Sequence, residues 1–470
     1  MTADRRWTIA SYAYGLLVAA VLGYFLLGLV VQVSDSFGNL LAVQRPTLAA
    51  LVRDQFTQHA YLRPLLWGQI KLVYELSDGQ YYVWFRGIHV VQVVMLIAVC
   101  LALMRPKTAL DAALVPLGIA ILTGSHTFAP MVREAFPINS FLTIAIGCLF
   151  AAWLTLRDRA RWYTDALMLA IFIGCVLTFE SGILVWVVCV AAVGLGARGL
   201  SRPAVAAMTM CLVAYMVVRM FVLHVGSPSL AERASGFGFG ILEPNQLMAR
   251  FEGRAWPFYL YNVVSSISTV LFSEPKGGVW LFIDELTRAS VDRWTAVSVA
   301  SSTVSTALIG WFVWTRRARF LSRTLDRDER IVALFLIALA ANAVISFPYT
   351  KNIIMSPAGA FLAVATYVAS RAWLQAAAPP RTAFAIAVVT MLSCGWAFRE
   401  AGTHYNLRQT AAEQRTEWVA VDGWLERQRI ALTSDDAHWL RDQLHRDAVW
   451  NHPTPFQFSR VWARWFEIDR

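Results

Sequence analysis

The acid Asp35 directly follows the first long apolar segment of the chain, in the run Val33-Ser-Asp-Ser-Phe. A carboxylate fixed at a membrane surface can take the proton from a hydroxyl or an amine and act as a general base. The alternative is that Asp35 caps a helix over residues 40–52, or is a solvated loop acid. The nearest further acid is Asp54, which we treat as a supporting residue.

Three basic residues lie close to the ends of apolar segments. Arg63 precedes Pro64, a residue favoured in the first turn of a helix. Arg219 ends an apolar run, and Lys351 lies in a short turn between two others. Such cations would suit a phosphate or pyrophosphate, which arginine binds in bidentate geometry. The alternative is that they extend to lipid headgroups.

Five further ionisable residues lie at or near the expected membrane depth, where such groups are candidates for function. They are His89, His126, Arg133, Glu134 and Glu180. For His89, inside an apolar segment, the alternative is a hydrogen bond between helices. Glu180 stands in a turn amid apolar sequence, so it needs a cationic partner, and arginine is the natural one.

The elements that position these residues are predicted to be membrane-spanning helices. Hydrophobic residues make up 57% of the 470 residues and charged residues only 15%, against about 25% in soluble proteins. We therefore expect an all-α polytopic membrane protein with about 20 apolar residues per span. The candidate spans are eleven: 8–33, 82–104, 108–124, 136–156, 163–179, 181–198, 204–223, 295–315, 331–348, 354–374 and 382–398.

The basic residues of the short connections predict the orientation. With the N-terminus in the cytoplasm, the connections 105–107, 157–161, 198–202, 316–330 and 371–381 are all cytoplasmic and all basic. This agrees with the positive-inside rule and places the C-terminus outside a cell inner (plasma) membrane. It also explains the net charge of +10 without a nucleic-acid partner.

The remaining polar stretches, 34–81, 124–135, 224–294 and 399–470, are then extracytoplasmic. The first is predicted to hold amphipathic helices over Leu40–Val52 and Leu62–Leu76. The apolar run Phe258–Phe272 is short for a span, which favours a re-entrant or interfacial helix. We divide the chain into a transmembrane domain, 1–398, and a tryptophan-rich helical cap, 399–470.

The sequence offers neither a metal-ligand pattern nor a nucleotide-binding motif. All six cysteines lie in apolar runs, which indicates small buried side chains: Cys100, Cys148, Cys175, Cys189, Cys211 and Cys394. The acid-poor first outer stretch argues against a dedicated divalent metal site, since such a site uses several oxygen ligands. Any group transferred at the outer face must come from a donor available there, and a lipid-linked donor meets that requirement.

The order of these features resembles the GT-C superfamily of integral membrane glycosyltransferases, in its protein O-mannosyltransferase-like branch. The resemblance covers roughly residues 1–375. It rests on Asp35, Tyr61-Leu-Arg63-Pro64-Leu, Arg86-Gly-Ile-His89, the loop with His126 and Glu134, Phe179-Glu180-Ser-Gly-Ile-Leu, and Tyr215-Met-Val-Val-Arg219. The branch often has paired acids where Asp35 stands alone, and a lysine where this chain has Phe179.

The resemblance implies transfer of a sugar from a polyprenyl-phosphate carrier to a protein, glycan or lipid acceptor. Asp35 would activate the acceptor, while Arg63, Arg219 and Lys351 would hold the donor phosphate. Glu180 would be a structural or lipid-site partner. Two other classes stay open: a transporter or flippase of a lipid-linked substrate, and a non-catalytic membrane assembly protein.

Overall fold

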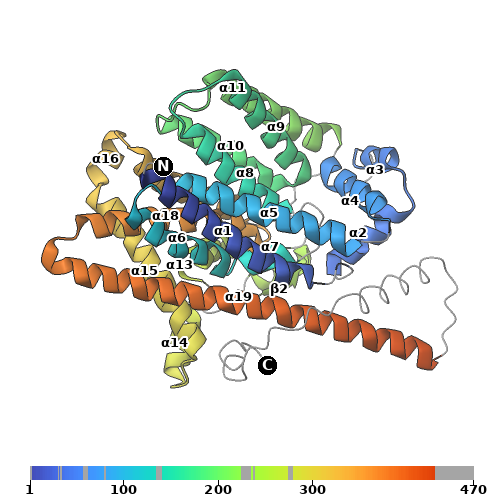
Figure 1. Ribbon diagram of the computed structural model, residues 1–470. Coiled ribbons are helices and arrows are strands. Elements are labelled where there is room, and N and C mark those ends of the chain that lie inside the picture. The colour runs from blue at the N-terminus through green and yellow to red at the C-terminus, as the bar shows by residue number, and fades with distance from the viewer. Residues whose placement is uncertain are drawn as a thin grey trace.

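The computed structural model describes residues 3–29, 31, 34–56, 62–78, 81–133, 140–223, 234–236, 239–273 and 279–428. Almost all of this is helical, and one short antiparallel ribbon joins β1 to β2 (Figure 1). The elements are α1 (Ala3–Leu27), α2 (Ser34–Gln44), α3 (Leu48–Asp54), α4 (Pro64–Ser77), α5 (Tyr81–Met104), α6 (Ala109–Gly124), α7 (Phe128–Arg133), α8 (Ser140–Thr155), α9 (Trp162–Thr178), η1 (Glu180–Gly182), α10 (Ile183–Gly194), α11 (Arg202–Val217), η2 (Val218–Val222), β1 (Ala234–Gly236), β2 (Phe239–Leu242), α12 (Pro244–Arg250), α13 (Trp256–Phe272), α14 (Val279–Thr287), α15 (Arg293–Thr315), α16 (Arg317–Ser322), α17 (Arg327–Ile345), η3 (Asn352–Met355), α18 (Ser356–Ala376) and α19 (Pro379–Gln428).

Six helical segments of the described chain are long and apolar enough to cross a membrane: Arg5–Leu27, Val83–Met104, Arg202–Phe221, Arg293–Thr315, Asn352–Ala376 and Pro379–Glu413. Shorter apolar helices cover Ala109–Gly124, Phe141–Thr155, Trp162–Thr178 and Glu180–Gly194. Each of the eleven apolar segments predicted from the sequence coincides with a helix. The helices therefore fit a multi-pass membrane protein.

Helix α18 lies at the centre of the bundle. In the most apolar stretch of Asn352–Ala376, 89% of the residues are buried. The helix packs against α6, α8, α15 and α17. Its side chains are mostly small, as in Ser356-Pro-Ala-Gly-Ala. Small side chains allow helix backbones to approach closely, which is how helices associate in lipid.

Helix α13 has its polar face inward and its apolar face outward. Asn262 and Ser266 are fully buried, whereas Leu260 and Val264 are about half exposed, at 55% and 54%. Asn262 Nδ2 donates a hydrogen bond to the carbonyl oxygen of Phe347 at 2.8 Å. A helix on the surface of a water-soluble protein shows the opposite arrangement. The pattern is therefore typical of a helix whose outer face meets lipid.

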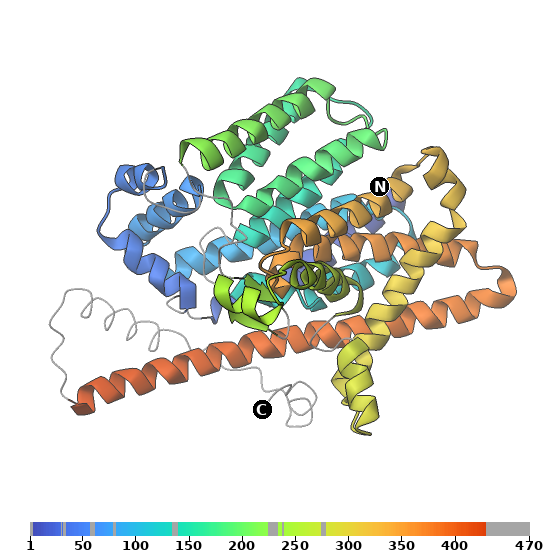
Figure 2. The ribbon, with the colours of Figure 1, turned by 180° about the vertical axis from the view of Figure 1, so that it is seen from behind.

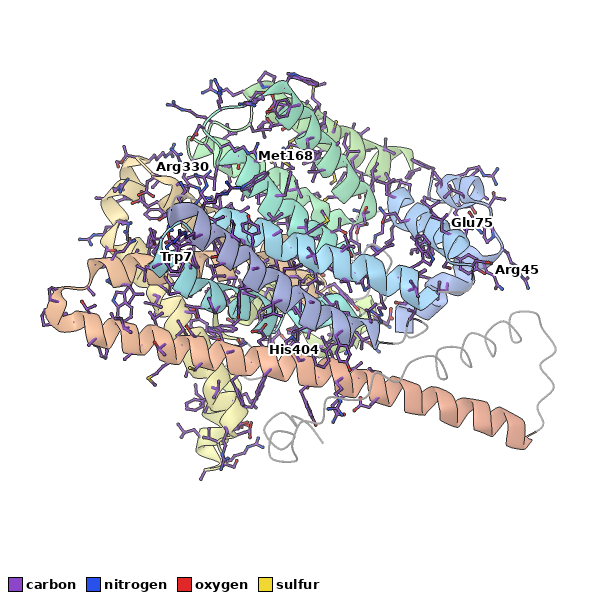
Figure 3. The ribbon with its side chains drawn as sticks, in the orientation of Figure 1. Trp7, Arg45, Glu75, Met168, Arg330 and His404 are labelled. Carbon is purple, nitrogen blue, oxygen red and sulfur yellow. The ribbon has the colours of Figure 1, made fainter. Side chains whose placement is uncertain are left out.

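Two groups of residues mark opposite ends of the bundle. The N-terminus and α16 lie at one end, and α2, α3 and α4 lie at the other (Figure 1). Trp7 and Arg330 accordingly lie near one end, with Arg45 and Glu75 at the far one (Figure 3). The predicted basic connections and the segment that carries Asp35 are thus separated along the bundle.

Charged side chains fasten the end that carries α16. Arg371 of α18 reaches Asp111 at the start of α6, at 3.3 Å, and Asp328 at the start of α17, at 2.6 Å. Arg327 Nη2 donates to the carbonyl oxygen of Leu103 at 2.7 Å, near the end of α5. Several arginines counted as positive-inside signals therefore also bind helix ends within the protein.

Helix α19 is continuous where the sequence suggested a boundary between span and cap. It runs from Pro379 through residue 398 to Gln428, 50 residues in all, or about 75 Å at 1.5 Å per residue. It passes along the bundle and projects beyond the end that carries α2–α4 (Figures 1 and 2). The remainder of the predicted cap, residues 429–470, lies outside the described residues.

Candidate functional site

Glu180 and Arg63 form the central ion pair of the candidate site. Arg63 Nε donates to both carboxylate oxygens of Glu180 at 3.0 Å, and Arg63 Nη2 donates to Oε2 at 2.6 Å. About a fifth of each side chain is exposed, 21% for Arg63 and 17% for Glu180. This forked geometry fixes both the direction and the distance of the two groups.

A tight turn after α9 presents Glu180. Phe179 is extended, with φ −158° and ψ 145°, and the short 3-10 helix η1 follows it. At its end Gly182 packs against the backbone of α9, where a Cβ atom would approach the carbonyl carbon of Cys175 to 2.4 Å. Only glycine, which has no Cβ atom, allows the two backbone segments to lie this close without one of them moving.

Arg63 reaches this turn from the start of α4. Pro64 occupies the first helical position, where its missing N–H costs nothing. The Arg63 guanidinium carbon lies 4.1 Å from the centre of the Phe179 ring, which adds a cation–π contact. Phe179 in turn meets Phe141 edge to face. Phe179 therefore supports the arginine side chain.

Arg219 completes the cluster from a third segment. It lies on the π-helical turn η2, is 5% exposed, and its Nη2 is 3.9 Å from Glu180 Oε1. A π-turn within a helix often marks a functional position. Two guanidinium groups and one carboxylate leave the cluster with a net charge of about +1 at neutral pH.

The structure brings Arg63, Glu180 and Arg219 together and leaves Lys351 apart. Lys351 is exposed, and its ammonium lies 4.8 Å from the centre of the Tyr349 ring. Neither a hydrogen bond nor an ion pair joins it to the three clustered residues in the described structure. Two of the three cations that were expected to converge, Arg63 and Arg219, therefore do so. The third, Lys351, is exposed in the turn before η3.

Asp35 lies in the first turn of α2, which starts at Ser34. Its side chain lies outside the described part of the chain. The proposed cap for a helix over residues 40–52 is wrong, since two helices cover this stretch and Thr47 caps the second through Ala50 N. Asp54 closes that second helix, with Arg53 Nε 3.9 Å away.

His89 is fully buried on α5 and lies 3.3 Å from Arg86, Nδ1 to Nη1. Arg86, which the sequence analysis did not single out, is also fully buried and bridges two connections. Its guanidinium donates to the carbonyl oxygens of Leu29, Val132 and Arg133, at 3.3, 3.3 and 3.1 Å. In the sequence, the feature that could have indicated this structural role is a charged residue within an apolar segment.

The loop between α6 and α8 supplies the other supporting residues. His126 is partly buried, and Arg133 ends α7 with an exposed side chain. Glu134 lies outside the described residues. Among the described residues, no group of three or more His, Cys, Asp or Glu side chains is arranged to hold a metal ion.

Comparison with known proteins gave no match. The chain fits no protein-family model, and neither a characterised protein nor a solved structure matches it. What the site does must therefore be argued from its own residues.

Sequence reasoning also missed Arg399, which was assigned to the outer cap. In the structure it is buried on α19 against α15 and Ser273, where four oxygen atoms accept its hydrogen bonds. The sequence feature that could have indicated its burial is the charged pair Arg399-Glu400 directly after an apolar segment.

Proposed function

We propose that this chain is an integral membrane glycosyltransferase that moves a sugar from a polyprenyl-phosphate carrier to an acceptor at the outer face of the membrane. The observation that carries the proposal is the Arg63–Glu180–Arg219 cluster, in which three separate segments meet at one carboxylate. The proposed topology has eleven spans, with the N-terminus in the cytoplasm and α2–α4 outside.

The charge of the cluster suits a phosphodiester. The charges of Arg63, Glu180 and Arg219 sum to about +1, and a sugar–phosphate–polyprenol carries one negative charge. Because Glu180 fixes the orientation of Arg63, the cation is already placed when the phosphate departs. Headgroup attraction would need no carboxylate between the arginines, so the cluster favours the phosphate site over that alternative.

The helix that carries Asp35 packs against the helix that Arg63 begins. Helix α2 contacts α4, and Lys71 of α4 donates through Nζ to the carbonyl oxygen of Val43, one residue before the end of α2, at 3.0 Å. This bond fixes the direction of α2 relative to Arg63. The arrangement supports an acceptor-activating acid and a phosphate site on one outer assembly.

The proposed reaction is a direct displacement at the anomeric carbon. Asp35 takes the proton of the acceptor hydroxyl as the acceptor oxygen bonds to that carbon. The bond from the same carbon to the phosphate oxygen breaks, and the polyprenyl phosphate leaves with the electron pair. Arg63 and Arg219 stabilise the charge that develops on the leaving oxygen.

The test uses the purified chain in proteoliposomes with radiolabelled polyprenyl-phosphate hexoses and pentoses and a membrane extract as acceptor source. We expect transfer by the wild type and a loss of about 1,000-fold in Asp35→Asn, the middle of the range for a general base. The control is Arg288→Gln, because Arg288 is 71% exposed and forms an ion pair with Asp284, four residues earlier in the chain. Binding of the lipid-linked sugar without any transfer would favour a transporter and overturn the proposal.

A further inference from the structure

Arg399 is a charged residue surrounded by neutral acceptors. Only 2% of it is exposed. Its Nη1 donates to the carbonyl oxygen of Ser298 at 3.3 Å and to the hydroxyls of Ser301 and Ser302 at 3.1 and 2.8 Å. Its Nη2 donates to Ser273 Oγ at 2.8 Å, and the guanidinium lies 3.9 Å from the centre of the Trp396 ring.

No carboxylate of the described chain forms an ion pair with Arg399, and its buried Nε lacks a hydrogen-bond partner there. The adjacent acid, Glu400, forms no ion pair with Arg399 in the described structure. The other clustered arginines differ, since Arg63 and Arg371 each bind carboxylates. A buried charge without a counter-ion is costly in a protein interior, so the described part of this site lacks one negative charge.

The two serines beside Arg399 can still donate one hydrogen. Ser273 Oγ and Ser302 Oγ are 2.6 Å apart, so one of these hydroxyls donates to the other. The accepting hydroxyl keeps its own hydrogen, because each serine has one donor and two acceptor positions. The remaining hydroxyl hydrogen and the Arg399 Nε–H, which has no partner among the described residues, are therefore the donors left at this cluster.

We propose that this cluster, formed by Arg399 with Ser273 and Ser302, binds a small monovalent anion, with chloride as the expected ligand. One such ion balances the single charge of the guanidinium. The near-complete burial of Arg399 favours a monatomic ion over a lipid phosphate, whose headgroup and chains need an open approach. The site lies apart from the Arg63 cluster and does not depend on the proposed sugar transfer.

The test measures thermal unfolding of the purified full-length chain in nanodiscs, titrated with sodium chloride, bromide or gluconate at constant ionic strength. We expect chloride and bromide to raise the unfolding midpoint, because a ligand that binds only the folded state stabilises it, and gluconate to leave it unchanged. Arg399→Gln should abolish the halide response, whereas Arg288→Gln should retain it. Ser273→Ala should keep the response but shift its chloride midpoint about tenfold higher.

A second readout covers the case in which Arg399→Gln does not fold. The ³⁵Cl line width should broaden with wild-type protein and much less with Ser273→Ala at equal concentration. Absence of both halide-specific stabilisation and line broadening in the wild type would overturn the proposal. So would a halide response that appears only in Glu274→Gln, since a carboxylate next to Ser273 in sequence would then be the counter-ion.

Discussion

Glu180 sets the position of both guanidinium groups in the candidate site. It accepts three hydrogen bonds from Arg63 and lies 3.9 Å from Arg219. Without its charge, two arginines would share a partly buried space and repel each other. The proposed phosphate site therefore depends on a residue that itself carries the wrong charge for phosphate.

For Glu180→Gln we expect the free energy of unfolding to fall by about 1–3 kcal/mol, since a charged hydrogen-bond acceptor is lost. Transfer should fall by about 10- to 100-fold because Arg63 is no longer held. The first quantity is measured by denaturant unfolding in detergent and the second by the proteoliposome assay.

A double-mutant cycle separates orientation from general damage. If Glu180 acts through Arg63, adding Glu180→Gln to Arg63→Gln should cost much less than it does in the wild type. Additive losses would show that the ion pair is irrelevant to transfer.

Gly182 gives a test of the turn that presents Glu180. In Gly182→Ala the new Cβ would meet the carbonyl carbon of Cys175 at 2.4 Å and the amide nitrogen of Val176 at 2.5 Å. We expect a loss of about 1–3 kcal/mol of folding free energy, as for other overpacked sites. The matched control is Gly174→Ala on α9, where nothing lies within 4 Å of the new methyl and a helical alanine should be neutral or stabilising. Equal stability of the two variants would contradict the close packing.

At the scale of elements, the α2–α4 assembly is held by a lysine that contacts helix ends rather than substrate. Lys71 is 5% exposed and binds carbonyl oxygens in the last turn of α2, those of Val43 and Gln44. A cation at a helix C-terminus is stabilising. On the proposed mechanism, Lys71 positions the helix that carries Asp35.

Lys71→Met should therefore increase amide hydrogen exchange over residues 34–44 and lower the turnover number by several-fold, with little change in KM for the lipid-linked donor. Lys71→Arg should restore most of both, because it keeps the cation. Lys107→Met, a change of an exposed lysine at the other end of the bundle, is the control. A raised KM with unchanged hydrogen exchange would count against a positioning role.

The helices were predictable from the sequence, but several of their contacts were not. Each of the eleven apolar runs overlaps a helix, six helical segments being long and apolar enough to cross a membrane, and the demand of Glu180 for an arginine was met by Arg63 and Arg219. Polar sequence after residue 398 was read as a separate cap, yet α19 continues because nothing there breaks a helix. The burial of Arg399 was not predicted, because its hydrogen-bond acceptors are serines of distant segments. No pattern in a single sequence shows that such serines meet one arginine.

At the scale of the whole molecule, polar side chains are buried within an apolar core while many large apolar side chains are exposed. Helix α15 buries Ser298, Ser301, Ser302 and Ser305, while apolar side chains such as Leu16 and Met210 are well exposed, at 60% and 73%. Water would favour the reverse arrangement, so lipid is the natural solvent for this surface. The protein can thus surround charged groups with oxygen atoms while its outside remains miscible with the bilayer.

The proposed topology makes a prediction for three exposed positions, each introduced singly as a cysteine after Cys211→Ser and Cys394→Ser. Arg45→Cys on the loop after α2 and Glu413→Cys on α19 should react with a membrane-impermeant maleimide added to intact spheroplasts. Ser322→Cys on α16 should react only after permeabilisation, because the proposed topology places the basic connection that holds α16 on the cytoplasmic side. If α13, about 25 Å long by its 17 residues, crossed the membrane as well, Ser322→Cys and Glu413→Cys would exchange sides while Arg45→Cys would not. That exchange would place the projecting end of α19 in the cytoplasm, on the opposite side from α2 and Asp35, and the eleven-span topology would be wrong.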